Sequence, residues 1–427
     1  MRNKLFILAA VIFISGGGQI VPAQVPTPQT FDTKSNNVSR TDDKTPVSRQ
    51  NRQQAYTKLL EGQRQIRKLR DLRTEAALES GAMLARQSLL RAVEFDPTLA
   101  EAYTALAELA KNAPPYNIED AIMMANLAVK INPNNFGGHF VLAQLYTFNS
   151  KLNRGTLDAS QTAKAIAEWK EIVRLDPRNA EAHAFLSEFY GRMSMPNEKI
   201  AELRSWVSSA PPYLSERSFY SKIFGESLAP EGASLKLGEA LTKAGQTREA
   251  VELLSLAVAD EPDNEEAVEL LGEAVKSADE KSSAVAVESL KQAVYANPEN
   301  TSLVVLLAQV QAKAGKTDDA AKVLQNASTE LTEKDENSAA NLQTVLGDIF
   351  AAKNRYEEAV TAYQSALTIR GIGDTEAVTP DRRDFAIRVF DKIIQIYKKA
   401  NRPNEAKAVI DRARLVLRKS DLFADKV

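Results

Sequence analysis

The sequence predicts an all-α protein, a right-handed superhelical solenoid of about nine helix pairs. The first observation behind this prediction is a turn with a proline that recurs along the chain. Successive turn prolines are separated by 36, 44, 35, 50 and 36 residues. An interval in the mid-thirties with occasional insertions is typical of stacked helix pairs. The prolines are Pro97, Pro133, Pro177, Pro212, Pro262 and Pro298.

The second observation concerns the helix expected after each turn. Proline lacks a backbone N–H and is tolerated near a helix start, so it ends one helix and permits the next. Nine residues after five of the prolines stands a leucine, and the residue after that leucine is small. A small side chain lets a neighbouring helix approach closely. These pairs are Leu106-Ala107, Leu142-Ala143, Leu186-Ser187, Leu271-Gly272 and Leu307-Ala308.

The third observation is an apolar stripe on the second helix of each unit. Apolar residues at offsets of four and seven lie along one helix face. In residues 353–369, Ala359, Tyr363 and Ala366 follow this spacing. The same series recurs as Ala85-Leu89-Ala92, Ala165-Trp169, Ala250-Leu254-Ala257, Ala286-Leu290-Ala293, Ala320-Leu324-Ala327 and Ala406-Ile410-Ala413.

These motifs resemble the tetratricopeptide repeat family, whose unit is a helix–turn–helix of about 34 residues. The Leu-Gly pairs Leu237-Gly238, Leu271-Gly272 and Leu346-Gly347 match the family's first helix, and the alanine series matches its second. The resemblance covers residues from about 51 to about 419. It implies that the first helix of each pair lines a concave groove in which peptides bind.

The N-terminus is typical of a secretory signal. Arg2 and Lys4 precede an apolar run, Leu5 to Ile14, that is short for a membrane span. We expect cleavage after Ala23 and an exported protein, periplasmic or extracellular, with no membrane span after cleavage. An uncleaved anchor is the alternative.

The remaining chain divides by composition. Residues 24–50 are rich in Pro, Thr, Ser, Asn and Gln, which predicts a disordered tether. An N-terminal array (51–212), a connector (213–230), a C-terminal array (231–419) and a tail (420–427) follow. The connector has two interpretations, an extra helix packed over the joint or an exposed aromatic contact surface. Its large apolar residues are Tyr213, Phe219, Tyr220, Ile223 and Phe224.

Charge is distributed unevenly, although the net charge is only −2. Residues 1–73 hold 13 Lys/Arg and 5 Asp/Glu, and residues 381–427 hold 13 and 7. The body between them is therefore strongly acidic. Such asymmetry bears on the choice of partner rather than on the fold.

No arrangement of residues predicts catalysis or a cofactor. The chain has no cysteine, which excludes disulfides and thiolate chemistry. The stretch AKAGKT, Ala312 to Thr317, lacks the first glycine of a phosphate-binding loop and is expected to be the turn of a repeat. The only histidines, His139 and His183, stand six residues after turn prolines, where Tyr103 also falls. Core packing between helices is favoured over a shared metal, because equivalent residues of neighbouring repeats lie too far apart.

The groove that the resemblance implies would be lined by the residues two positions after each conserved leucine. All eight are acidic or amide, and we call them the ladder. An acidic surface attracts cationic segments, although exposed helix positions favour Glu and Gln in any case. The ladder comprises Glu108, Gln144, Glu188, Glu239, Glu273, Gln309, Asp348 and Gln395.

The N-terminal helix carries a cluster of basic residues that is expected to meet phosphate groups, an anionic membrane surface or an acidic protein, or to form a polar cap. We call it the basic arm: Arg64, Arg67, Lys68, Arg70 and Arg73. Residues 49–73 would also compete for the acidic groove of a second molecule and allow head-to-tail self-association. Nucleic acid is not expected as a partner, because export separates the protein from it.

The sequence therefore predicts an exported, non-catalytic scaffold that binds proteins or peptides, with basic segments preferred. The alternative is an assembly or structural subunit of an envelope polysaccharide-export or secretion machine. No enzyme activity, metal or cofactor is expected.

Overall fold

A computed structural model describes residues 47–209, 218–373 and 378–423. Contacts divide the chain into residues 1–48 and 49–427, and the repeats lie in the second unit. The predicted signal peptide, most of the tether and the end of the tail lie outside the described residues. The described part holds nineteen α-helices and one short 3-10 helix, η1 (Leu69–Asp71), and no strand.

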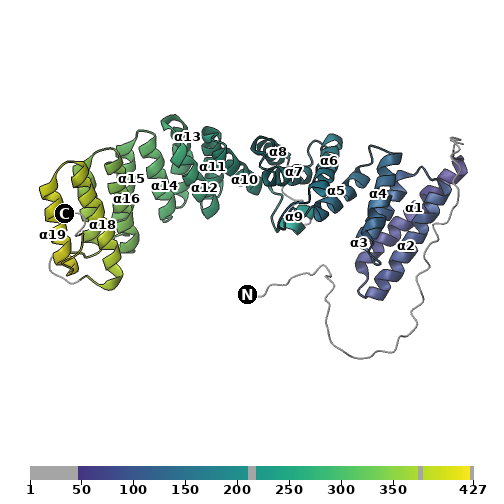
Figure 1. Ribbon diagram of the computed structural model, residues 1–427, viewed down its shortest axis with the longest axis horizontal. Coiled ribbons are helices and arrows are strands. Elements are labelled where there is room, and N and C mark those ends of the chain that lie inside the picture. Colours follow the sequence, from purple (N-terminus) through teal and green to yellow (C-terminus); the bar gives the residue numbers. More distant parts are fainter. Residues whose placement is uncertain (1–46, 210–217, 374–377, 424–427) are drawn as a thin grey trace, which may run out of the picture. The chain divides into compact units, whose positions relative to one another are not determined.

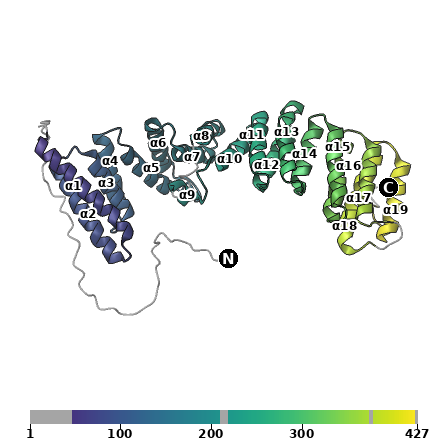
Figure 2. The ribbon, with the colours of Figure 1, turned by 180° about the vertical axis from the view of Figure 1, so that it is seen from behind.

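Eighteen of these helices form nine pairs, as the sequence predicts, and the solenoid is all-α. The remaining helix, α9 (Phe219–Phe224), falls in the predicted connector. The pairs are α1 (Arg49–Lys68) with α2 (Glu75–Phe95), α3 (Ala100–Asn112) with α4 (Ile118–Ile131), α5 (Phe136–Asn149) with α6 (Ala159–Leu175), α7 (Ala180–Arg192) with α8 (Pro196–Ser209), α10 (Pro230–Lys243) with α11 (Thr247–Asp260), α12 (Glu265–Ser277) with α13 (Glu280–Ala296), α14 (Thr301–Lys313) with α15 (Thr317–Leu331), α16 (Glu336–Ala352) with α17 (Tyr356–Ile369) and α18 (Pro380–Lys399) with α19 (Pro403–Leu417). Most helices that follow one another along the chain lie side by side (Figures 1 and 2), although α12 and α13 both lie against α11.

Four of the first helices, α5, α7, α12 and α14, begin at an asparagine that stands two residues after the turn proline. Asn135 accepts a hydrogen bond from the backbone N–H of Gly138 at 2.7 Å, and Asn179 accepts one from Ala182 at 3.0 Å. Such a cap satisfies one of the N–H groups that a helix start leaves unpaired. Asn264 and Asn300 cap α12 and α14 in the same way. The turn therefore combines a proline that stops one helix with an asparagine that starts the next.

The second helices bury the alanine series that the sequence predicts. Ala85, Leu89 and Ala92 have no exposed surface, and neither do Ala165 and Trp169. Most of these second helices pack against the first helix of their own pair and the first helix of the pair that follows, whereas α13 packs against α11 and α14 and α19 packs against α18 alone. Burial of this stripe is the main favourable term for such a fold, because it removes apolar surface from water.

The Leu-Gly pairs do not all act in the same way. A Cβ added at Gly347 would lie 2.4 Å from the Tyr363 ring, and one at Gly238 would lie 2.5 Å from Leu254. These two glycines therefore allow close contact between the two helices of a pair. At Gly272 the nearest atom, on Leu306, is 3.9 Å away. The sequence expectation of close packing holds for the first two but not for Gly272.

The stretch AKAGKT follows the sequence expectation. Gly315, in the stretch AKAGKT, adopts φ +77° in the turn between α14 and α15, so this stretch is a repeat turn. Residues 150–158 lengthen the turn between α5 and α6, and within it Leu152 is buried. Helix α8 buries Ile200, Leu203 and Trp206.

The connector does not interrupt the hydrophobic core. One continuous cluster of buried residues extends from Ala107 to Ala314, and Trp206 Nε1–H donates to the Leu228 carbonyl at 3.0 Å. Helices α8 and α10 are also in contact. The arrays on either side of the connector therefore share one core.

Candidate functional site

All eight ladder residues lie on first helices, from α3 (Glu108) to α18 (Gln395). Three of them are linked to the neighbouring first helix by a lysine. Lys111 donates to Gln144, Lys236 pairs with Glu188 at 3.0 Å, and Lys392 pairs with Asp348 at 2.5 Å. The ladder therefore belongs to a surface shared by adjacent first helices.

The lysines change the electrostatics that the ladder positions suggest. Glu239 pairs with Lys243 at 2.5 Å and Glu273 pairs with Lys276 at 3.1 Å. With Glu188 and Asp348, four of the five ladder carboxylates have a lysine partner. The surface is thus of mixed charge along most of its length, and it is not the uncompensated acidic face that the eight positions alone indicate.

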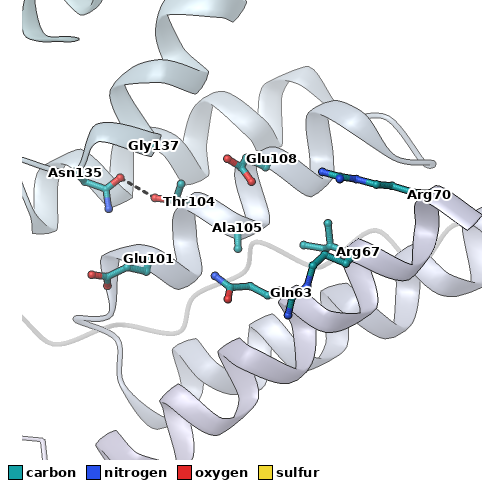
Figure 3. A pocket seen from close by; sticks show the side chains of 10 residues that line it. Gln63, Arg67, Arg70, Glu101, Thr104, Ala105, Glu108, Asn135 and Gly137 are labelled. Atoms are coloured by element: carbon teal, nitrogen blue, oxygen red, sulfur yellow. Dashed lines mark hydrogen bonds between the residues drawn. The ribbon is translucent and has the colours of Figure 1, made fainter. Parts of the chain in front are cut away.

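Glu108 is the exception, and it lines a cavity of about 440 Å³ between α1, α3 and the start of α5 (Figure 3). Arg67 extends from α1 and Arg70 from η1, whereas Glu101 and Glu108 extend from α3. All four side chains are exposed. We call this the N-terminal pocket, and it presents two cations and two anions in one concave site.

The walls of the N-terminal pocket are fixed by close contact between α3 and α5. Thr104 Oγ1 donates to Asn135 Oδ1 at 2.8 Å, the same oxygen that caps α5. A Cβ at Gly137 would lie 2.5 Å from Thr104 Cγ2, so glycine is required for this approach. These contacts are made by neutral groups, so they fix the walls of the pocket without engaging its four charged side chains.

The pocket also perturbs the ladder acid within it. Desolvation raises the pKa of Glu108, and nearby Lys111 opposes that change. Burial likewise lowers the pKa of Lys111. A carboxylate with a raised pKa gains by acquiring a cationic partner, so Glu108 is the ladder residue best prepared to receive one.

The basic arm is part of the array. Residues 49–68 form α1, the first helix of the first pair, and Ala55, Leu59 and Gly62 bury its inner face. All five basic residues of the arm are exposed, and two of them line the N-terminal pocket. Helix α1 packs closely on α2, where a Cβ at Gly62 would lie 2.7 Å from Leu89. Self-association through the basic arm stays a prediction.

Helix α9 covers the ladder at α7. Tyr220 is fully buried, and its hydroxyl lies 3.0 Å from Glu188 Oε1 and 3.1 Å from Glu226 Oε2. Lys236 Nζ lies 3.0 Å from each of the same two carboxylates. The Tyr220 backbone N–H donates to Glu181, and burial raises the pKa of that acid. Glu188 is thus occupied by the chain itself.

The described aromatic residues of the connector pack over the joint between the two arrays. This agrees with the interpretation of the connector as an extra packed helix. The Phe185 ring lies 5.3 Å from Phe219, 5.4 Å from Tyr220 and 6.0 Å from Phe224 between ring centroids. Ile223 is half-buried against the same cluster. Tyr213 lies outside the described residues.

Both histidines pack between helices, and each bonds to a carboxylate of its own. His139 Nδ1 lies 2.6 Å from Glu168, and His183 Nδ1 lies 2.6 Å from Glu202. Each Nε2 lies 3.0 Å from the carbonyl oxygen of its turn proline, Pro133 or Pro177. Two acceptors per ring favour the doubly protonated imidazolium. Among the described residues, no group of three or more potential ligands that could hold a metal occurs.

None of the helices in the described residues is long and apolar enough to cross a bilayer.

Comparison with protein families identifies tetratricopeptide repeats in residues 233–264 and 306–374. These matches confirm the resemblance that the sequence motifs indicate. No curated protein sequence matches the chain.

Several solved structures are similar to parts of the chain. YrrB, described as a tetratricopeptide repeat protein with an unusual peptide-binding site, is 14% identical with a TM-score of 0.33, over 51% of this chain and 97% of its own. A tetratricopeptide repeat protein from Parabacteroides merdae is 14% identical with a TM-score of 0.33, over 69% and 99%. MamA (41-end) from Desulfovibrio magneticus RS-1 is 19% identical with a TM-score of 0.26, over 45% and 97%.

Proposed function

We propose that this tetratricopeptide repeat protein is an exported, non-catalytic scaffold that binds a segment of a partner protein along its first helices. The single observation that carries the proposal is the N-terminal pocket. It is a concave site of about 440 Å³, built by three first helices, in which charged side chains are exposed.

The chemistry of the pocket suits a polypeptide with a basic residue. Glu101 and Glu108 offer carboxylates on one wall, and Arg67 and Arg70 offer donors to backbone carbonyls or to an acidic neighbour on the other. Elsewhere on the ladder, lysines already satisfy the carboxylates. The preference for a cationic segment is therefore concentrated at this end of the array.

Exposed apolar side chains extend the same surface. Tyr56 and Leu60 are 47% and 57% exposed and lie on α1, in the helical register of Gln63 and Arg67. Large apolar side chains beside a polar cleft are typical of a protein-binding surface. A partner segment with an apolar residue next to a basic one fits this arrangement.

A photoreactive residue placed at Gln63 or Glu101 tests the proposal in cells of the source organism. We expect one discrete crosslinked partner from both positions and none from Gln87, an exposed position on α2. The double variant Glu101→Lys with Glu108→Lys should abolish the crosslink from Gln63 and leave the thermal unfolding midpoint unchanged, since both residues are exposed. Equal crosslinking from all three positions would overturn the proposal.

Export is tested separately by cell fractionation and N-terminal sequencing. We expect a mature chain that begins near Gln24, outside the cytoplasm. An intact Met1 on a cytoplasmic species would contradict this part of the proposal.

A further inference from the structure

A second cavity, of about 310 Å³, lies at the C-terminal end of the array. Asn337 and Asn341 of α16, Asp384, Phe385 and Arg388 of α18, and Arg370 after α17 line it. No ladder residue and no residue of the N-terminal pocket takes part. We call it the C-terminal cavity.

Arg370 is the unusual member of the C-terminal cavity, because it is a buried cation with an unfilled donor. The residue is only 7% exposed, and its Nε has no hydrogen-bond partner among the described residues. Its nearest carboxylate, Glu336, lies 3.8 Å from Nη1 and is already paired with Arg382 at 2.8 Å. Buried polar groups are nearly always hydrogen-bonded, so this donor indicates a missing acceptor.

The neighbouring groups define the charge of that acceptor. The lining of the cavity holds two cations, Arg370 and Arg388, and one anion, Asp384. Glu336 and Arg382 pair with each other outside this lining. The excess of one cation among the lining residues matches a monoanion and disfavours a phosphate dianion, which would lie close to Asp384. Asparagine side-chain amides at positions 337 and 341 add neutral donors.

The flat face of the guanidinium is also occupied. The Arg370 guanidinium carbon lies 5.6 Å from the centroid of the Phe385 ring. Stacking of this kind fixes the plane of the donor fork. A fixed planar fork is suited to the two oxygens of a carboxylate.

We infer that the C-terminal cavity is a site for a single carboxylate, held by Arg370 with Arg388 and Asn341, and supplied by an aspartate or glutamate side chain of a bound polypeptide. That the carboxylate comes from a polypeptide rests on the proposed function; the carboxylate site itself does not. The array would then prefer opposite charges at its two ends.

The test follows the Arg370 Nε–H signal by NMR in the full chain labelled with ¹⁵N-arginine, assigned with Arg370→Lys. The probe is glutamate capped as acetyl-Glu-N-methylamide, and its matched control is acetyl-Gln-N-methylamide. We expect the glutamate probe, at millimolar concentration, to shift this signal downfield as the hydrogen bond forms, and the glutamine control to leave it unchanged. Sodium phosphate at equal ionic strength should bind more weakly.

Exposed residues provide variants that retain the fold. Arg388→Gln and Asn341→Ala should each weaken binding of the glutamate probe by about fivefold, the loss expected for one hydrogen bond. Arg383→Gln, an exposed neighbour on α18 that does not line the cavity, should have no effect. The titration is repeated with Asp374→Asn and Glu376→Gln combined, so that carboxylates following Arg370 in the sequence do not compete.

Three results would each overturn the inference. They are no shift in either the parent chain or the Asp374→Asn, Glu376→Gln variant, an equal shift with the glutamine control, and tighter binding of phosphate than of the glutamate probe. Because the probe needs no partner protein, failure here is distinguishable from failure of the crosslinking experiment.

Discussion

The position six residues after the turn proline is filled in two ways in two regions of the array. In α5 and α7 it holds His139 and His183, each bonded to a carboxylate and to a proline carbonyl. In α12 and α14 it holds Val268 and Val304, and Val304 is 2% exposed within an apolar cluster. The repeat therefore fixes where this side chain lies but not the kind of interaction that holds it.

The two solutions differ in what destabilises them. A hydrogen-bonded position is weakened when a partner is removed, because the remaining polar group stays buried. An apolar position is weakened when the volume changes or a polar group enters. The histidine region should thus respond to pH and partner loss, whereas the valine region and the glycine contacts beyond it should respond to steric change.

The largest expected effect is steric and falls in the C-terminal region. Gly347→Leu should lower the free energy of unfolding by about 1–3 kcal/mol, at the upper end of that range, because its Cβ would overlap the buried Tyr363 ring. Hydrogen exchange of α16 and α17 reports the local effect, since an array of repeats need not unfold in one step.

Gly272→Ala is the matched control for the glycine prediction. Its Cβ would meet nothing closer than 3.9 Å, so removing a helical glycine should be neutral or stabilising by up to about 1 kcal/mol. Equal destabilisation by Gly347→Leu and Gly272→Ala would contradict the conclusion that Gly347 is closely packed and Gly272 is not.

A transplant of the histidine arrangement tests the comparison directly. Val304→His should destabilise the array by about 1–3 kcal/mol, because a buried imidazole gains no carboxylate partner. Val323 is the register equivalent of Glu168, since Ala320 and Ala165 share a position on their second helices. Adding Val323→Glu should recover part of the loss below pH 6.5. A double variant that is no better than the sum of the two single variants would count against transferable chemistry.

The ladder offers an effect of comparable size with its own matched pair. Glu188→Lys should cost about 1.5–3 kcal/mol, because Glu188 is hydrogen-bonded to the buried Tyr220 and paired with Lys236. Glu273→Lys should be nearly neutral, since Glu273 is exposed and pairs only with Lys276. Thermal unfolding measures both; similar midpoints would mean that α9 does not depend on Glu188.

This pair separates a ladder residue that is free to meet a partner from one that the chain itself occupies. We expect charge reversal to leave folding largely intact at Glu273 but not at Glu188. A partner-binding test of the ladder therefore requires exposed members, such as Glu108, rather than Glu188.

Sequence reasoning was successful where the determinants are local. The turn prolines, the leucine–small pairs and the alanine series lie within one helix or one turn, and they predict the nine pairs. The asparagine caps could also have been predicted, because each stands two residues after a turn proline. The packing of the connector could only be given as one of two alternatives.

The functional surface is set by residues far apart in sequence, and no local pattern reveals it. Lys236 and Glu188 are 48 positions apart, and Lys392 and Asp348 are 44 apart. Lys236 and Lys392 share a repeat position, three residues before a ladder residue, but each pairs with the ladder residue of the preceding first helix. The ladder was therefore predicted without its counter-charges. Arg370 presents the same difficulty, since nothing in its neighbourhood of the sequence indicates burial.

The smallest expected effect is the pH dependence of the histidine region. The hydrogen bond from His139 to Glu168 raises the pKa of His139 despite burial. Burial lowers the pKa of His183, but Glu202 and the Pro177 carbonyl outweigh it, and the net change is upward. A pKa raised in the folded state adds stability that is complete below the unfolded value of about 6.5 and is lost as pH rises through the folded value.

We therefore expect the thermal unfolding midpoint of the parent chain to fall as pH rises from below 6.5 into the alkaline range. The midpoint of the double variant His139→Val with His183→Val should fall less over the same range. The double variant is the control for all other titrating groups, because only the two imidazoles differ between the chains. Glu168→Gln with Glu202→Gln should flatten the profile in the same way, since it removes the acceptor that favours the imidazolium. Parallel profiles for all three chains would mean that the histidines remain neutral and that their region is held no differently from the valine region.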